Sequence, residues 1–119
     1  MINHNLKREK VNPITTLTFT GADGSKYRFS VYPKNIRVNS GPALYSFLKR
    51  TDGKYYVLYI GKSEDLAQRL SDHHKWDEAG RLGFEFLAIC RGVRAGDLEA
   101  AEATLIRQYR PRCNEVVPR

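Results

Sequence analysis

A set of polar residues along this chain has side chains that can bind phosphate, transfer protons or hold a metal ion. Arg69 can hold a phosphate through two parallel hydrogen bonds, and His73 can carry a proton near neutral pH. Glu102 offers a carboxylate, which is a ligand that Mg²⁺ accepts. The remaining candidates are Tyr45, Tyr59, Lys62 and Asn114. Together these residues would supply a phosphate clamp, groups for proton transfer and a metal ligand.

The position of Glu102 in the hydrophobic pattern supports a special role for its carboxylate. The residue lies four positions after Leu98 and four before Ile106, so it falls within or beside the apolar stripe of an expected helix. A buried carboxylate is costly unless it is paired or binds a cation. A glutamate at the border of the stripe that reaches solvent, or pairs with an arginine, is the alternative, and the periodicity alone favours it slightly. The stripe consists of Leu98, Ala101, Leu105, Ile106 and Tyr109.

Arg69 and His73 are spaced so that they would share one face of a helix. Taken singly, each has an ordinary explanation, as a surface cation and as half of the pair His73-His74. Lys62 could bind phosphate or lower the pKa of a nearby phenol, but a solvated lysine is equally consistent with the pattern. Asn114 could orient a phenol or an imidazole, although asparagine most often serves as a turn residue.

Tyr45 and Tyr59 fall on two strands that the sequence joins in a hairpin. The expected strands cover residues 43–49 and 55–60, with Asp52-Gly53 in the turn between them. Cross-strand neighbours can place two phenols on one face of a sheet, although ordinary sheet packing is the alternative. Another hairpin is expected over residues 15–32, with a glycine-rich turn at residues 21–25.

The remaining elements follow from capping signals and from alternation. Ser63 is a suitable N-cap for a helix that would run to about His74, and residues 76–80 form a loop or a short helical turn. Residues 84–90 alternate as a third strand. Asp97 is expected to cap the last helix, and Pro111 to end it.

The order and spacing of these residues resemble the GIY-YIG nuclease superfamily over roughly residues 42–114. Tyr59 is followed by Lys62 after three residues and by Arg69 after ten. The first triad departs from the family's pattern, since Ala43-Leu44 stands where the family has Gly-Ile, and the hairpin loop is longer by a residue or two. The matching segments are Ala43-Leu44-Tyr45, Tyr59-Ile60-Gly61, Lys62, Arg69, His73, Glu102 and Pro111-Arg112-Cys113-Asn114.

The resemblance implies an α+β fold with a small central antiparallel three-stranded sheet flanked by helices, to which this chain adds an N-terminal β-hairpin. We expect an arm and hairpin over residues 1–41 and the nuclease-like domain over residues 42–119. The implied activity is divalent-metal-dependent cleavage of DNA phosphodiesters, with Mg²⁺ held by Glu102 and Mn²⁺ able to substitute. The implied functional residues are Tyr45, Tyr59, Lys62, Arg69, His73, Glu102 and Asn114. Either tyrosine could be the general base.

Charge and composition agree with a nucleic-acid partner. The formal net charge is +7 and the isoelectric point is about 9.6, which favours a polyanion. Arginines outside the motif, among them Arg91, Arg94, Arg107, Arg110 and Arg112, are candidates for contacts with backbone phosphates. No apolar run has the length of a membrane span. Without a signal-peptide core, and with Cys90 and Cys113 expected as reduced thiols, we predict a cytoplasmic protein.

Other functions fit the same residues. A non-catalytic nucleic-acid-binding or protein-interaction module on the same fold is one alternative, although a binding module has no need of a metal carboxylate. An RNA-cleaving enzyme is another, because the same chemistry would serve it. We expect DNA binding without strong sequence specificity, and a monomer or a weak dimer.

Overall fold

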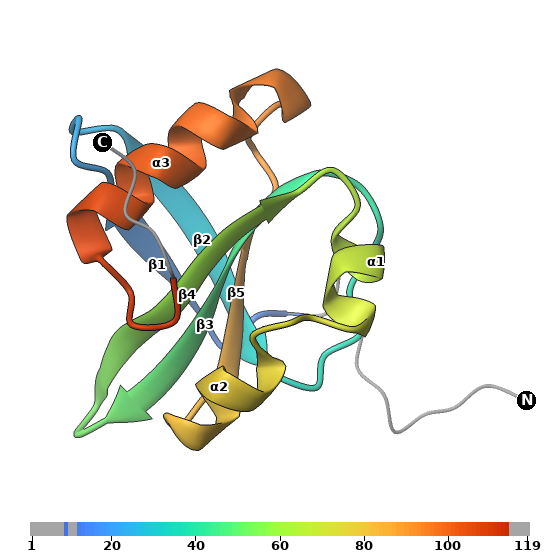
Figure 1. Cartoon of the computed structure of the whole chain (residues 1–119), viewed down its shortest axis with the longest axis vertical. Coiled ribbons are helices and arrows are strands. Elements are labelled where there is room, and N and C mark those ends of the chain that lie inside the picture. The colour runs from blue at the N-terminus through green and yellow to red at the C-terminus, as the bar shows by residue number, and fades with distance from the viewer. Residues whose placement is uncertain (1–8, 10–11, 115–119) are drawn as a thin grey trace, which may run out of the picture.

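The computed structural model describes residue 9 and residues 12–114, and it is built around one antiparallel sheet (Figure 1). Five strands form the sheet in the order β1-β2-β5-β3-β4. We expected a central sheet of three strands with an added N-terminal hairpin, and the structure differs in that β2 of this hairpin pairs with β5, so that all five strands belong to one sheet. The strands are β1 (Thr15–Thr20), β2 (Lys26–Pro33), β3 (Ala43–Thr51), β4 (Lys54–Ser63) and β5 (Phe86–Cys90).

The hairpin of β3 and β4 determines where the two candidate tyrosines lie. Asp52 and Gly53 both have positive φ, 53° and 77°, as a tight hairpin turn requires. The register shifts between Phe47 and Leu48, so that β4 contains one residue without a partner. Beyond this bulge Tyr45 lies opposite Gly61, and Tyr59 is the diagonal neighbour of Tyr45 on the same face of the sheet.

Successive residues of β3 point to opposite faces of the sheet and so build two separate cores. Tyr45 and Phe47 belong to a core that also contains Leu66 and Leu70 of the first helix. Leu44 and Leu48 point the other way, into a core that also includes the buried side of the last helix. The strands that carry the candidate site are therefore packed on both faces, which fixes their side chains.

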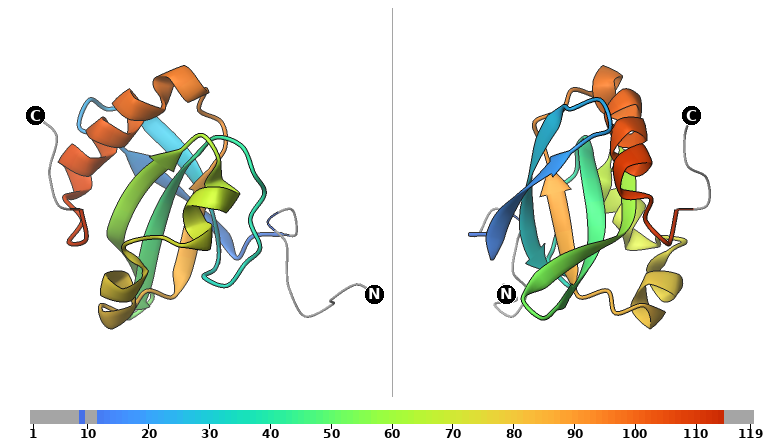
Figure 2. Two further views of the ribbon diagram at one scale, coloured as in Figure 1. Left: turned by 45° about the vertical axis from the view of Figure 1, so that its right-hand side comes forward. Right: turned by 90° about the vertical axis from the view of Figure 1, so that its left-hand side faces the viewer.

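In the part of the chain that the structure describes, three α-helices and one short 3-10 helix accompany the sheet. In Figure 1, α1 and α3 flank the end of β4, and α2 lies near the opposite end of the sheet. In both views of Figure 2, α3 and α2 lie near opposite ends of the sheet. They also pack on opposite faces, because Ala79 of α2 belongs to the core of Tyr45 and Leu105 of α3 to the core of Leu44. Among the described residues, none of the helices is long and apolar enough to cross a membrane. The helices are α1 (Leu66–Ser71), α2 (Trp76–Arg81), α3 (Leu98–Tyr109) and the 3-10 helix η1 (Ala95–Asp97).

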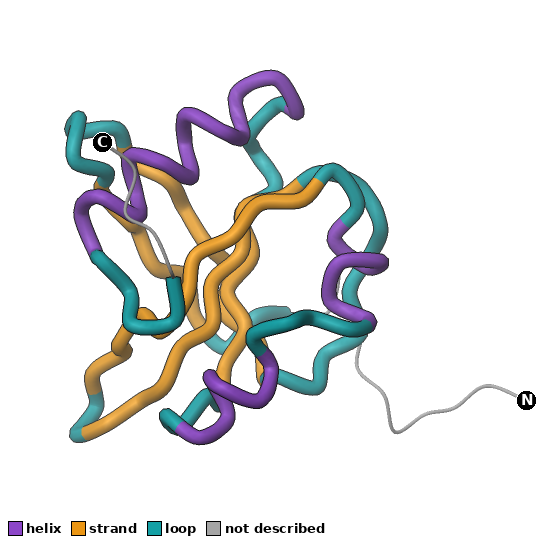
Figure 3. The backbone as a smooth tube through the Cα atoms, viewed as in Figure 1, coloured by secondary structure: helices purple, strands orange, loops and turns teal. Residues whose placement is uncertain are grey.

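The first helix differs from its prediction at both ends. Ser63 closes β4, and Asp65 caps the helix instead, since its side chain accepts a hydrogen bond from the Gln68 N–H at 3.3 Å. The helix stops at Ser71 because Asp72 leaves helical geometry, with φ −153° and ψ 73°. His73 therefore lies in the loop between α1 and α2, drawn teal in Figure 3, and does not share a helix face with Arg69.

The last helix begins and ends where the sequence indicates, although its cap differs from the expectation. Asp97 precedes α3, but its side chain makes no capping hydrogen bond. Arg110 ends the helix in the left-handed region, with φ 45° and ψ 59°, just before Pro111. The turn that follows brings Cys113 to the open edge of β4, where its N–H donates to the Leu58 carbonyl at 2.9 Å. This turn closes part of an edge that would otherwise be unpaired.

Candidate active site

The two candidate tyrosines and the candidate histidine form one contiguous group. The Tyr45 hydroxyl and His73 Nε2 are 2.7 Å apart in a buried hydrogen bond. The Tyr59 ring lies edge-on to the His73 ring, with 5.0 Å between their centroids. The rings of Tyr45 and Tyr59 are 6.0 Å apart. All three side chains are almost completely buried, so the protein itself sets their protonation.

The backbone fixes the direction of the hydrogen bonds through this group. His73 Nδ1 accepts from the Lys75 N–H at 2.9 Å, so it carries no proton in the neutral ring. Nε2 must then hold the proton and donate it to the Tyr45 hydroxyl. The hydroxyl proton of Tyr45 is thereby free for the neighbouring Tyr59, whose ring lies 6.0 Å away and whose pKa is lowered by hydrogen bonding from Tyr45. His73 thus donates to Tyr45, and Tyr45 can donate to Tyr59.

Burial and this donor chain affect the two phenols differently. Burial is the main cause that raises the pKa of both Tyr45 and Tyr59. The hydrogen bond between them lowers the pKa of Tyr59 and raises that of Tyr45 further. Burial also lowers the pKa of His73 to about 4, so the imidazole is neutral at pH 7. Of the two phenols, Tyr59 is the one whose anion the site stabilises better.

Arg69 is the cation that the whole group shares. Its side chain is exposed on α1, yet its positive charge lowers the pKa of Tyr45, Tyr59 and His73, and also that of Glu102. An arginine that acts on all of these groups while facing solvent is placed to meet an incoming anion beside them. The fork of its guanidinium suits two oxygens of a phosphate.

Glu102 projects from α3 toward the same region, half-buried. Burial is the largest influence on this carboxyl and raises its pKa, while the charges of Lys62 and Arg69 lower it. The backbone N–H of Lys62 also lowers the pKa of Glu102 by hydrogen bonding. Lys62 was expected to act on a phenol, but the largest cationic effects on the pKa of Tyr59 come from Arg69 and Lys75. In the structure the charge of Lys62 therefore acts on the Glu102 carboxylate.

Gly61 allows the two phenols to approach each other. It lies opposite Tyr45 in the sheet, and the Tyr45 side chain crosses it. A Cβ atom on Gly61 would stand 2.5 Å from Cζ and Oη of Tyr45, and 2.8 Å from Cε2 of Tyr59. A side chain at this position would therefore overlap the site itself. The third residue of the Tyr59-Ile60-Gly61 triad is small because the Tyr45 ring occupies its space.

Asn114 was expected to orient a phenol or an imidazole, but in the structure its side chain binds the backbone. Its Oδ1 accepts from the Ile60 N–H at 3.0 Å, and its Nδ2 donates to the Ile60 carbonyl at 2.9 Å. Both halves of the amide are thus used on one residue of the β4 edge. Because Ile60 follows Tyr59 directly, Asn114 fixes the strand that carries the candidate base.

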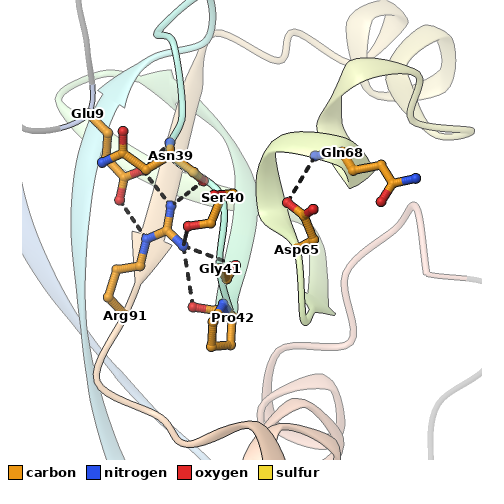
Figure 4. A network of polar contacts seen from close by, with 8 residues as sticks. All are labelled: Glu9, Asn39, Ser40, Gly41, Pro42, Asp65, Gln68 and Arg91. Carbon is orange, nitrogen blue, oxygen red and sulfur yellow. Dashed lines mark hydrogen bonds and ion pairs between the residues drawn. The ribbon is translucent and has the colours of Figure 1, made fainter.

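A second network, centred on Arg91, holds the segment that contacts the start of α1 (Figure 4). The guanidinium of Arg91 is paired with the Glu9 carboxylate, with 2.7 Å between Nε and Oε2. It also donates to the backbone carbonyls of residues 39–42, at 2.7 to 3.3 Å. The Gly41 carbonyl in this segment accepts in turn from the N–H of Leu66, the first residue of α1. Arg91 thereby holds the start of the helix that carries Arg69.

An open cavity of about 650 Å³ lies beside these groups. Lys62 of β4 and Arg69 of α1 line it, together with Leu98 and Glu99 at the start of α3. Glu102 itself is not part of the lining, and it lies one helical turn further along α3 from Leu98 and Glu99. The cavity leads from solvent to the exposed side of the cationic pair, so an anionic ligand can reach Arg69 directly.

The arginines expected to contact nucleic acid have different surroundings. Arg110 and Arg112 are exposed after α3, beside the open part of the β4 edge, whereas Arg107 is partly buried. Arg91, another arginine outside the motif, is committed to the network above. Arg94, which is mostly exposed, pairs with Asp97 at 3.3 Å.

Sequence reasoning missed residues whose role depends on distant contacts. Lys75 is buried near Tyr59, lowers the pKa of that phenol and pairs with Glu78 at 3.1 Å. In the sequence, the only hint of a role for Lys75 was its position directly after the doublet His73-His74. Trp76 packs against both Phe47 and Phe84, 5.1 and 5.2 Å from their ring centroids, so it belongs to the core.

The residues present suit a hard divalent cation with few protein ligands. Among the described residues, no cluster of three or more His, Cys, Asp or Glu side chains could enclose a metal ion. Glu102 offers one half-buried carboxylate beside a solvent-filled cavity. Mg²⁺ retains most of its water and binds through one or two carboxylates, so this donor set fits it.

Solved structures with the same architecture come from the GIY-YIG N-terminal endonuclease domain of UvrC from Thermotoga maritima. A tyrosine-to-phenylalanine mutant of that domain, bound to its catalytic divalent cation, is 28% identical, with a TM-score of 0.52 over 66% of this chain and 87% of that one. The magnesium-bound domain is 26% identical, with a TM-score of 0.51 over 64% of this chain and 85% of that one. No protein-family model matches the sequence, and no curated protein does.

The chain therefore has the GIY-YIG fold, as its motifs indicated. The bound cations of these structural neighbours, and their description as endonuclease domains, support a nuclease with a divalent-metal site. The individual roles of the site residues are inferred from the geometry described above.

Proposed function

We propose that this protein is a divalent-metal-dependent DNA endonuclease that hydrolyses phosphodiester bonds. The observation that carries the proposal is the buried group of Tyr45, Tyr59 and His73, in which the Tyr45 hydroxyl and His73 are 2.7 Å apart, together with the charges of Arg69 and Glu102 that act on its phenols. An exposed phosphate clamp beside buried proton-transfer groups is what phosphodiester hydrolysis requires. The GIY-YIG fold supports the same reaction class.

In the proposed reaction Arg69 holds the non-bridging oxygens of the scissile phosphate and stabilises the charge that develops on them. Tyr59 first loses its phenol proton to solvent, and the resulting phenolate takes the proton from the attacking water, whose oxygen forms the new bond to phosphorus. The bond from phosphorus to the leaving sugar oxygen breaks, and that oxygen leaves with the electron pair and takes a proton from solvent. The products are a phosphate monoester and a free hydroxyl.

The assignment of Tyr59 as base rests on the direction of the hydrogen bonds. Because His73 donates to Tyr45, the Tyr45 hydroxyl can donate to Tyr59 and stabilise its anion. Tyr45 and His73 then position and polarise the base and do not compete with it. This arrangement favours Tyr59 over Tyr45, the alternative that the sequence left open.

We assign the metal site to Glu102, with Mg²⁺ as the cation and Mn²⁺ as its substitute. A cation held there would neutralise negative charge on the phosphate and on the leaving oxygen. Lys62, which lowers the pKa of Glu102, keeps the carboxylate in its charged, ligating form. Asn114 and Arg91 hold β4 and α1 in place and take no part in the chemistry.

We also propose that binding depends mainly on backbone phosphates, in agreement with the net charge of +7, and has little sequence specificity. The buried free thiols of Cys90 and Cys113 are consistent with a cytoplasmic protein. A monomer or a weak dimer would present the same site.

The deciding experiment is cleavage of supercoiled plasmid and of labelled single-stranded DNA with Mg²⁺, with Mn²⁺ and with chelator. Wild type should cut only with metal, and Glu102→Gln should not cut. Arg69→Ala should be slower by about 100-fold or more. Arg28→Ala, which removes an exposed arginine on β2, is the matched control and should cut normally.

Two results would contradict the proposal. Cleavage by Glu102→Gln at the wild-type rate would remove the metal assignment. Binding of DNA without cleavage in any metal would favour a binding module, and cleavage of RNA alone would favour a ribonuclease.

A further inference from the structure

A second hollow, of about 420 Å³, lies on the same edge of β4 as the Asn114 contact. We call it the Tyr56 hollow. Its walls combine cations with aromatic rings, and none of the described residues that line it is acidic. The cavity beside Arg69 differs, because acidic residues such as Glu64 and Asp65 line it. The charged and aromatic lining residues of the Tyr56 hollow are Lys49, Tyr55, Tyr56, Tyr109, Arg110 and Arg112.

The cations of this hollow are available to a ligand. Arg110 and Arg112 are exposed, and neither forms an ion pair with any described residue. Lys49 lies over the Tyr56 ring, with its ammonium 5.6 Å from the ring centroid. A group of cations without acidic neighbours attracts a polyanion, and arginine can bind phosphate through two parallel hydrogen bonds.

One ring in the hollow is free to stack. Tyr55 packs edge-on against Phe86, and Tyr109 packs against Phe19. Tyr56 is 46% exposed, and no other aromatic ring among the described residues packs against it. Aromatic side chains beside a basic groove are the platforms on which unpaired bases stack. In a duplex the faces of the bases are already stacked on their neighbours, so the ring suits a single strand.

The hollow is also within reach of the proposed catalytic group. Tyr56 precedes Tyr59 by three residues on β4, a distance of roughly 10 Å along an extended strand. The turn that carries Arg112 continues directly to Asn114, which is bonded to Ile60 beside Tyr59. A DNA strand that lay along this edge of β4 would pass from the Tyr56 hollow to the candidate active site.

From these observations we infer that the Tyr56 hollow binds an unpaired nucleotide of the substrate strand, with its base stacked on Tyr56 and its phosphates on Lys49, Arg110 and Arg112. The inference rests on the proposed function for the identity of the ligand. It adds that the enzyme takes DNA with a single-stranded segment next to the scissile bond.

The test measures binding without cleavage, in the full chain carrying Glu102→Gln. The probe is a labelled single-stranded thymidine oligonucleotide of about 15 nucleotides, compared with a duplex of the same length. Adding Tyr56→Ala should weaken binding of the single strand by at least about 5-fold, and binding of the duplex by less than about 2-fold. Tyr56→Phe keeps the ring and should bind both probes like its parent.

A second pair of variants tests the phosphate contacts. Arg112→Ala should weaken binding of both probes and reduce the salt slope for the single strand by about 0.7. Arg28→Ala removes the same charge on β2 and should leave both affinities unchanged. Equal losses for single strand and duplex in Tyr56→Ala, or no loss, would overturn the inference.

The two proposals fail separately. If the wild-type protein cuts no DNA but single-strand binding still needs Tyr56, the nucleotide-binding role of the hollow is supported and the endonuclease assignment is wrong. If the wild type cuts DNA and Tyr56→Ala binds like its parent, the endonuclease assignment is supported and the role of the hollow is wrong.

Discussion

Replacement of Gly61 by alanine is the sharpest test of how the two phenols are packed. The new methyl group would lie 2.5 Å from Cζ and Oη of Tyr45, whereas carbon atoms in contact lie about 3.5–4.0 Å apart. The overlap is thus roughly 1 Å or more. Tyr45 has no exposed surface and is tied to His73 at 2.7 Å, so its ring cannot swing outward. The phenols must shift or the strands must separate.

The expected cost follows from overpacking of a buried core. Insertion of a methylene into a tight interior destabilises a protein by about 1–3 kcal/mol, and the fixed ring places this variant near 3 kcal/mol. Gly61 has no positive φ, so backbone strain adds nothing and the effect is steric. In urea unfolding, Gly61→Ala should lower the transition midpoint. Cleavage should fall as well, because Cε2 of Tyr59 is 2.8 Å from the same methyl.

Gly80 provides the matched control. It lies in α2, and a Cβ atom there would meet no atom within 4 Å. Gly80→Ala should therefore stabilise the protein by about 0.5–1 kcal/mol, because alanine is the better helix former. If Gly61→Ala unfolded at the same urea concentration as the wild type and cut DNA normally, the close packing described here would be wrong.

Two further changes test the groups around the phenols. Burial lowers the pKa of His73 to about 4, whereas the pKa of an unfolded histidine is about 6.5. As the pH falls below 6.5 the unfolded state therefore binds the extra proton first, and the free energy of unfolding should drop by about 2 kcal/mol between about pH 7.5 and pH 5. In urea titrations, His73→Gln should lose this pH dependence. Arg91→Ala should lower the free energy of unfolding by about 2–3 kcal/mol. Arg91→Lys should recover less than half of this loss, because one ammonium cannot replace the guanidinium that spans Glu9 and residues 39–42. Equal stability of the two variants would refute this reasoning.

Local signals predicted the elements that position the site. Asp52-Gly53 specified the hairpin, because both residues must adopt positive φ, which these residue types tolerate. The apolar stripe of α3 predicted a helix with Glu102 at its border, and the carboxylate is half-buried there. Both predictions needed only residues close together in sequence.

The errors arose where distant contacts determine the conformation. A helix was expected to continue to His74, but burial of His73 against Tyr45, 28 positions earlier, takes the chain out of the helix at Asp72. The extra strands of the sheet likewise depend on pairing of β2 with β5, far along the chain. No local pattern carries that information.

The same limit applies to the roles of the site residues. The motif selected Asn114, but its partner is the backbone of Ile60, 54 positions away, and no periodicity indicates this contact. Arg91 looked like one more cation for phosphate, until the carboxylate of Glu9, 82 positions away, accounted for its charge. Residue types could suggest the chemistry, whereas the division between reacting and positioning groups required the folded chain.

Burial gives the site a distinctive electrostatic character. It raises the pKa of both phenols and of Glu102 and lowers that of His73, so it drives all these groups toward their neutral forms. Arg69, whose guanidinium is a permanent cation, faces solvent. A bound phosphate therefore meets the exposed cation of Arg69 backed by the neutral phenols and the neutral imidazole, and this leaves much of its charge uncompensated. A second cation beside Glu102 would complete the neutralisation, which is the physical reason to expect that cleavage depends strictly on a divalent metal.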